Sequence, residues 1–268
     1  MNNKAIRIRS IFVSLLLCFF LVSLSYAVDL TLRDLFNKIQ SNQSKIKDMY
    51  AETTTTITSS ISMPGAESKG PQKMVQKGKM WMKGKDKSKI EMLSPMKQIT
   101  ITNGDQMAII NPVTGQKMVQ DLSKIRGQGI KGSRDQGAMD LEKALEYFDL
   151  KVRKLDALKP GNLSAEGGSA SGGETYVIEG VPKEANKFLG KMEFYVDSDR
   201  WLPVKIMMYD PKGKIVSQSA IEYGEFSGAW TPIKNISDVN SPMGKMNLEM
   251  KYENIKINQG VSDSKFKI

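Results

Sequence analysis

The chain contains no histidine and only one cysteine, and aromatic residues make up 7% of its 268 residues. Without histidine it cannot form a Ser-His-Asp triad, a Cys-His pair, an HExxH zinc site or a His-ligated haem or copper site. With one cysteine it cannot close an intramolecular disulfide, so its stability has to come from burial. The apolar and charged fractions, 40% and 25%, are those of a globular protein rather than a disordered one.

The first 27 residues have the pattern of a secretory signal peptide. A basic start precedes an apolar run over residues 11–24, and the small residues Ser25 and Ala27 occupy the −3 and −1 positions of a cleavage site. The run is shorter than the roughly 20 residues that span a bilayer, which disfavours the alternative of an uncleaved anchor. We therefore expect a periplasmic protein of residues 28–268, exported by a cleaved signal peptide that removes Cys18.

Two stretches carry apolar residues at helical spacing. The first, Thr31–Met49, begins with a capping-box pattern of Thr31 and Asp34, and the second covers Ala138–Phe148. We predict an amphipathic helix in each. The residues that form their apolar faces are Leu32, Leu35 and Phe36 in the first and Leu141, Leu145 and Phe148 in the second.

Most of the remaining chain alternates apolar and polar residues with period two, the pattern of half-buried strands. Asn103-Gly104 is a strong hairpin signal, and Asp210-Pro211-Lys212-Gly213 is typical of a tight turn. The short turns favour a single domain over residues 28–268, mainly β, with an antiparallel sheet of about ten or eleven strands and two or three helices. The alternating segments cover residues 53–62, 74–82, 89–92, 99–102, 107–109, 117–122, 150–155, 176–180, 191–197, 202–209, 215–223, 233–239 and 245–252.

Two stretches interrupt this pattern. Residues 160–173 are rich in Gly and Ser and predict a flexible connector. Residues 124–137 are rich in Gly, Lys and Arg, and "GQGIKG" at 127–132 matches G-x-G-x-x-G. A dinucleotide site needs a parallel βαβ unit around that motif, whereas its flanks predict antiparallel strands, so the sequence favours a plain loop.

Carboxylate pairs are the catalytic option that the composition leaves open. Asp197 and Asp199 lie in a polar hairpin turn, and Glu142 and Glu146 lie one helical turn apart on a solvated face, so neither pair has the buried setting that separates two pKa values. The net charge of +10 is compatible with nucleic-acid binding, but the sequence contains no arginine cluster with interleaved aromatics, which such binding would favour. We expect no enzymatic activity, no cofactor, no metal and no nucleic-acid partner.

Methionine is frequent, with 17 in the chain, and many lie on the apolar side of the predicted strands. Methionine is unbranched and adapts to irregular partners, so these residues indicate either a methionine-filled core or an apolar surface that accepts flexible acyl chains. Two helices cover such a sheet incompletely, which favours a cavity. The residues predicted to line the cavity are Met80, Met82, Ile90, Met92, Ile99, Ile101, Met107, Ile109, Phe194, Val204, Ile206 and Leu248, and the predicted helices would form its lid.

Three segments carry a family resemblance. The segment "KIEMLSPMKQITITNGDQMAIINPVTGQ" at 89–116 combines a strand ending near Pro95, a hairpin at Asn103-Gly104 and a strand closing on Asn111-Pro112. The segments "FYVDSDRWLPVKIMMYDPKGKI" at 194–215 and "NIKINQGVSDSKFKI" at 254–268 follow in order. In this order the chain resembles the LolA-type outer-membrane lipoprotein carriers, the lipoprotein-sorting family, over nearly all of residues 28–268.

The resemblance implies an unclosed antiparallel half-barrel whose helices form a lid over a hydrophobic cavity. It also implies a monomeric periplasmic carrier that takes lipoprotein acyl chains, or another lipid, from an inner-membrane ATP-driven release complex to an outer-membrane receptor. The best-known carriers hold the lid with one buried basic residue, and Lys85, Lys87 and Lys89 lie in the matching window. The alternatives are a lipid-sensing or scaffold protein of the same fold and, less favoured, a carboxylate-based hydrolase.

Overall fold

The structure is a computed structural model that describes residues 30–60, 70–123, 141–155, 174–241 and 244–268. The chain divides into two units, Met1–Thr31 and Leu32–Ile268. Only Leu30 and Thr31 of the first unit belong to the described residues, and every element below belongs to the second. The predicted signal peptide, the loop motif at 127–132 and the connector at 160–173 lie outside the described residues.

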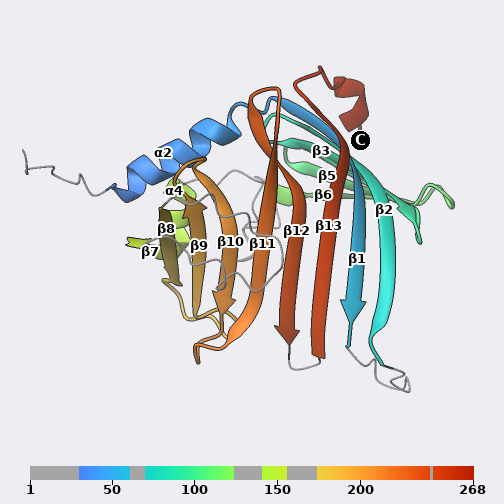
Figure 1. The fold of residues 1–268 in the computed structure, drawn as a ribbon. Coiled ribbons are helices and arrows are strands. Elements are labelled where there is room, and N and C mark those ends of the chain that lie inside the picture. Colours follow the sequence, from blue (N-terminus) through green and yellow to red (C-terminus); the bar gives the residue numbers. More distant parts are fainter. Residues whose placement is uncertain (1–29, 61–69, 124–140, 156–173, 242–243) are drawn as a thin grey trace, which may run out of the picture. The chain divides into compact units, whose positions relative to one another are not determined.

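The second unit is built on one 13-stranded sheet in the order β6-β5-β4-β3-β2-β1-β13-β12-β11-β10-β9-β8-β7 (Figure 1). All neighbouring strands are antiparallel, and β6 and β7 do not pair with each other, so the sheet is unclosed. The strands are β1 (Asp48–Ser59), β2 (Gln72–Lys83), β3 (Lys87–Ser94), β4 (Gln98–Asn103), β5 (Gln106–Ile110), β6 (Lys117–Asp121), β7 (Phe148–Leu155), β8 (Thr175–Pro182), β9 (Lys191–Asp197), β10 (Leu202–Tyr209), β11 (Ile215–Phe226), β12 (Ala229–Ser241) and β13 (Gly244–Ile257).

The mainly β class and the unclosed antiparallel sheet confirm the prediction, but the predicted number of strands was too low. Each alternating segment forms a strand of its own. Even the short β4 and β5 pair with a neighbour on both sides, because tight turns return the chain at once. The sequence located the alternating segments but left the number of strands uncertain. In the structure all thirteen segments pair with a neighbour.

The first and last strands of the sheet lie side by side at its centre. β1 pairs with β13 from Met49 opposite Ile257 to Ser59 opposite Met246. On one side of this pair, β2 to β6 form the first meander, and on the other side β12 to β7 form the second. This long-range pairing joins the two meanders into one sheet.

The register sorts side chains onto two very different faces, because successive residues of a strand point to opposite sides. On one side, Met80 of β2 lies opposite Ile90 of β3, and Leu248 of β13 lies opposite Ile57 of β1. On the other side, Lys79 lies opposite Glu91. We call these the apolar face and the charged face. Lys154, near the end of β7, is a charged residue on the apolar face.

In the described part of the chain, three short helices accompany the sheet: α2 (Leu32–Gln43), α4 (Leu141–Tyr147) and the 3-10 helix η1 (Asp263–Phe266). Helix α2 buries Leu35, Phe36 and Ile39 and contacts β7, β10 and β12. It ends earlier than predicted, because β1 already begins at Asp48. The second predicted helix is also shorter, and Phe148, predicted as helical, is the first residue of β7.

A small core joins the end of α2 to the centre of the sheet. Met49, Ala229 and Ile257 are buried together, and Ile46, which follows α2, packs against them. The hydroxyl of the buried Thr231 lies 3.3 Å from the Met49 sulfur and donates to it. Strands β1, β12 and β13 thus meet the N-terminal helix at one end of the apolar face.

The C-terminal segment is fixed to the sheet at three points. The buried Asp48 carboxylate accepts hydrogen bonds from the backbone N–H groups of Gln259 (3.0 Å) and Gly260 (3.2 Å). Asp263 accepts from Lys83 at 2.9 Å and from Lys87 at 2.7 Å. Phe266 is fully buried, and its helix η1 contacts β3 and β4.

Replacing Phe266 should therefore weaken the whole fold. We expect Phe266→Ala to lower the free energy of unfolding by about 3 kcal/mol, since it leaves a cavity between η1 and the sheet. Urea denaturation measures this change, with Lys267→Ala, an exposed neighbour, as the control. Equal unfolding midpoints for the two variants would contradict the anchoring role of Phe266.

Candidate functional site

The apolar face brings together most of the residues that the sequence predicted to line a cavity. Val204 is buried at a β-bulge of β10, where the register shifts between Pro203 and Lys205. Nine others lie on the apolar face by direct pairing: Met80, Met82, Ile90, Met92, Met107, Ile109, Phe194, Ile206 and Leu248. Six strands, β2, β3, β5, β9, β10 and β13, thus contribute predicted residues to this face.

Ile99 and Ile101 do not belong to this surface, and their placement there was wrong. They lie opposite Glu91 and Lys89, on the charged face, while the threonines of β4 lie on the apolar face. Ile101 is nevertheless 5% exposed, because η1 packs against β4 and the Asn103 side-chain amide donates to the Phe266 carbonyl at 3.3 Å. The C-terminal segment, not a lipid cavity, covers it.

Methionine supplies much of the apolar face. Met74, Met80 and Met82 follow one another along β2, and Met246 and Met250 lie on β13, across β1. On the far strands, Met192 of β9 lies opposite Met208 of β10. Unbranched thioether side chains leave a deformable surface rather than a fixed shape, which suits a flexible apolar partner.

This face is only partly covered by the described residues. The side chains of Met80, Ile90, Met107, Phe194 and Leu248 are half-buried. On β8 and β9 the packing is tighter, with Ile178 and Val196 on the same face fully buried. Among the described residues, the apolar face is therefore closely packed at β8 and β9 and half-buried over much of the first meander.

The predicted lid residues come from two helices that are weakly joined. Leu35 and Phe36 are buried, whereas Leu32, Leu141 and Leu145 are half-buried. One ion pair, Arg33 to Glu142 at 3.2 Å, links α2 with α4, and both side chains are exposed. An exposed pair of this kind contributes little to stability, so it does not lock the two helices.

The lysines in the window of the family's latch lie elsewhere. Lys87 forms an ion pair with Asp263, and Lys89 forms one with Glu91 at 2.7 Å. Both lie on the charged face, and Lys85 lies in the exposed turn between β2 and β3. None of the three reaches the apolar face.

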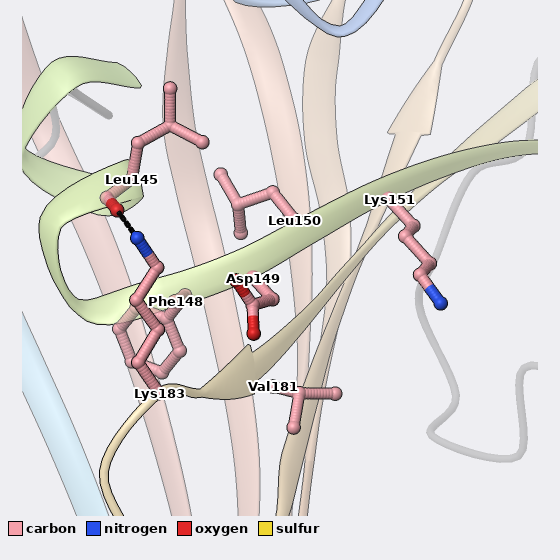
Figure 2. A pocket seen from close by; sticks show the side chains of 7 residues that line it. All are labelled: Leu145, Phe148, Asp149, Leu150, Lys151, Val181 and Lys183. Atoms are coloured by element: carbon pink, nitrogen blue, oxygen red, sulfur yellow. Dashed lines mark hydrogen bonds between the residues drawn. The ribbon is translucent and has the colours of Figure 1, made fainter.

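A pocket of about 590 Å³ lies at the free edge of the sheet, where α4 leads into β7 (Figure 2). The Lys183 ammonium donates to the Leu145 carbonyl at 2.6 Å across its mouth. The pocket includes the predicted lid residues Leu145 and Phe148 but none of the predicted cavity residues. Its lining is Leu145, Phe148, Asp149, Leu150, Lys151, Val181 and Lys183.

The strongest electrostatic feature lies on the charged face, around Glu193 of β9, which is 3% exposed. One carboxylate oxygen accepts from Lys191 (3.0 Å) and Arg153 (3.1 Å), and the other from the hydroxyls of Tyr195 and Tyr209 (2.8 Å each). Burial opposes ionisation, but these donors outweigh it and hold the pKa of Glu193 at about 2. Burial and the Glu193 charge raise the pKa of Tyr195 to about 12.

Four donors engage the Glu193 carboxylate, so the cluster links β7, β9 and β10. Asp197 is also engaged: it accepts from Arg200 at 2.6 Å and from the backbone N–H of Asp199 at 2.8 Å. Among the described residues, no group of three or more Asp, Glu, His or Cys could hold a metal ion. No helix in the described part is long and apolar enough to cross a membrane.

Comparison with known proteins identifies a matching family and structures of similar fold. A family model described as "-like: Uncharacterized protein" matches residues 130–268, more than half of the chain. The chain belongs to this family. No curated protein matches it.

Solved structures show the fold. A DUF1329 family protein from Desulfovibrio piger matches with 16% identity over 88% of this chain and 96% of its own, with a TM-score of 0.58. A LolA superfamily protein from Nitrosomonas europaea matches with 15% identity over 89% and 98%, with a TM-score of 0.55. A putative outer membrane lipoprotein-sorting protein domain from Vibrio parahaemolyticus matches with 15% identity over 87% and 95%, with a TM-score of 0.54. The chain has a LolA-type fold, which confirms the resemblance.

The Glu193 cluster should make stability depend on pH. The folded pKa of Glu193, about 2, lies below the ordinary value of 4.5, so its contribution is complete above pH 4.5 and is lost as the pH falls from there toward 2. We expect Glu193→Gln to be less stable than the parent at pH 7 and to lose less stability than the parent between pH 5 and 3.

Thermal unfolding at several pH values measures this difference. Glu253→Gln, which removes an exposed carboxylate of β13 on the same face, is the control and should leave the parent's pH profile unchanged. Parallel profiles for Glu193→Gln and the parent would contradict the assignment.

Proposed function

We propose that this protein is a periplasmic carrier that binds the acyl chains of lipoproteins, or of another lipid, on its apolar face and carries them from the inner to the outer membrane. The observation that supports this proposal is the methionine-rich apolar face, many of whose side chains on β2, β9, β10 and β13 are half-buried in the protein alone. A surface of this kind accepts hydrocarbon of variable shape.

The energetics are sufficient for such a cargo. Each methylene that leaves water contributes about 0.8 kcal/mol, so an acyl chain with about fifteen methylenes gains on the order of 12 kcal/mol when the face shields it. The charged face has the opposite role. Its cross-strand ion pairs, such as Lys234 with Glu222 at 3.4 Å, keep the loaded protein hydrated.

Helix α2 is the element that would compete with the lipid. In the structure it occupies the apolar face through Leu35, Phe36 and Ile39 and contacts β7, β10 and β12. Its polar contacts include Asn42, which donates to the Arg200 carbonyl, Lys38, which lies 4.3 Å from the Trp201 ring, and the exposed ion pair of Arg33 with Glu142. The buried side chains of Leu35, Phe36 and Ile39 make the apolar contact that an acyl chain would replace.

The rest of the proposal follows from the resemblance to the lipoprotein-sorting family. The export signal would place the protein in the periplasm, an inner-membrane ATP-driven complex would load it, and an outer-membrane receptor would unload it. This chain itself would make or break no bond in such a cycle, so we propose a protein without catalytic activity.

The second candidate is a lipid-sensing or scaffold protein of the same fold that does not transport. The tight packing of Leu35, Phe36 and Ile39 favours it, because a permanently seated α2 would leave less of the face available to lipid. The two candidates differ in whether lipid leaves the membrane with the protein.

Co-purifying lipid distinguishes them. We expect protein isolated from the periplasm without detergent to release acyl lipid into organic solvent in a near-stoichiometric amount, measured by mass spectrometry. Protein that is lipid-free, and that stays so after incubation with membranes, would contradict the carrier function.

Adjacent residues on opposite faces provide matched variants. Met107 of β5 lies on the apolar face and Gln106 on the charged face, and Ile57 and Thr56 of β1 form a second such pair. We expect Met107→Lys and Ile57→Lys to reduce extraction of labelled lipoprotein from membrane vesicles at least tenfold, since a buried charge must be desolvated.

The controls are Gln106→Lys and Thr56→Lys, which add the same charge to the other face. They should extract lipoprotein as the parent does. If the Met107 and Ile57 variants remain folded by circular dichroism and still extract normally, the apolar face is not the binding site.

A further inference from the structure

The hairpin turns of this sheet lie at two opposite ends of the strands. Because neighbouring strands are antiparallel, the connections after β3, β5, β8 and β10 fall at one end, and those after β2, β4, β9 and β11 fall at the other. We call the first set of turns, residues 95–97, 111–116, 183–190 and 210–214, the apolar rim. The second set, residues 84–86, 104–105, 198–201 and 227–228, is the polar rim.

Large exposed hydrophobic side chains gather at the apolar rim. Phe188, Val113 and Met96 occupy three of its turns and are 83%, 74% and 69% exposed. Leu93, Val181 and Ile215 are exposed on the strand ends beside these turns. The other exposed large hydrophobic side chains of the described residues lie near strand ends at the same end of the sheet: Met118 and Val119 follow the turn at 111–116, Tyr147 precedes β7, and Met74 and Val75 lie near the start of β2.

The polar rim is different in composition. Its turns consist of glycine, serine and charged residues, and its large apolar side chain, Trp201, stacks on Tyr176 with ring centroids 5.8 Å apart. A single exposed hydrophobic residue needs no explanation, but a set confined to one end of a sheet marks an interaction surface.

Lysines accompany the hydrophobic side chains. The apolar rim contains Lys97, Lys183, Lys187, Lys212 and Lys214 against two acidic residues, Glu184 and Asp210. Asp210 accepts from the backbone N–H groups of Lys212 (2.9 Å) and Lys214 (2.8 Å), so its carboxylate is engaged in the turn. The rim therefore presents positive charge beside apolar side chains.

Exposed lysines are not confined to the apolar rim, so positive charge alone does not distinguish the two ends of the sheet. Lys45, Lys47 and Lys85 are exposed near the polar rim, where the Lys47 carbonyl accepts from the Gly84 N–H at 2.8 Å. Among the turns that the structure describes, only those of the apolar rim combine exposed hydrophobic side chains with lysines. A partner that needs both features would therefore bind at the apolar rim.

We propose that the apolar rim is an attachment surface for an anionic lipid bilayer. Phe188, Val113 and Met96 insert into the boundary between headgroups and acyl chains, and the neighbouring lysines pair with lipid phosphates. Turn tips suit this role because they project beyond the last paired residues of the strands. The attachment does not depend on the proposed carrier function, since a sensor without cargo could also use it.

Vesicle sedimentation tests this attachment with the full exported chain. We expect binding to protein-free vesicles of phosphatidylcholine with about one-third phosphatidylglycerol, and weaker binding to phosphatidylcholine alone. Raising the salt concentration from about 0.05 M to about 0.5 M should weaken binding without abolishing it, since salt screens the lysines but not the apolar contacts. Absence of binding to both vesicles, or binding only to native membranes that contain proteins, would overturn the proposal.

Two triple variants separate the contributions. Met96→Ser with Val113→Ser and Phe188→Ser should reduce vesicle binding at least about tenfold. Lys97→Gln with Lys212→Gln and Lys214→Gln should remove most of the preference for the anionic vesicles.

The matched control changes the same number of lysines at the other end: Lys45→Gln with Lys47→Gln and Lys85→Gln. It should bind as the parent does, and an equal loss in both lysine triples would overturn the orientation. Failure of the carrier function would look different: Met107→Lys should still sediment with vesicles, while the serine triple variant should still contain any lipid it has acquired.

Discussion

The alternation of side chains between the two faces of thirteen paired strands is the constraint on which the rest of this structure depends. Because the period is two, a slip of one residue in any pair would move lysines to the apolar face and methionines to water. The pairing of β1 with β13 fixes the register at the centre, and the turns fix it outward from there. The separation of charge from hydrocarbon is therefore a property of the whole sheet.

The sequence predicted the alternation within each strand. It could not predict, for every turn, which face of the sheet the apolar residues of the next strand would join. Met74 to Met82 and Lys245 to Tyr252 keep their predicted faces, because each is one uninterrupted strand. The turn at 95–97 carries Met92 opposite Gln98, and this places Ile99 and Ile101 on the other side from Ile90. The helix predicted to reach Met49 stops at Gln43 because tertiary pairing of β1 overrides local periodicity.

Features that join distant segments were beyond the sequence. The Glu193 cluster unites β7, β9 and β10, and its one local signal is the spacing of Lys191, Glu193 and Tyr195 on a single face. The burial of Phe266 depends on a C-terminal segment that has no period of its own. The apolar rim also went unpredicted, since exposed hydrophobic residues in turns become a pattern only when topology shows which turns share an end.

The position of β1 and β13 also governs how this molecule can assemble. Ile57 must pair with Leu248, which lies 191 residues later in the sequence (248 − 57), before the middle of the sheet exists. Each meander can form early from neighbouring hairpins, but they remain two unjoined halves until synthesis reaches the last strand. The apolar faces of the two meanders therefore become one surface only after β13 has been synthesised and has paired with β1. The joining of the two halves is the last step of assembly.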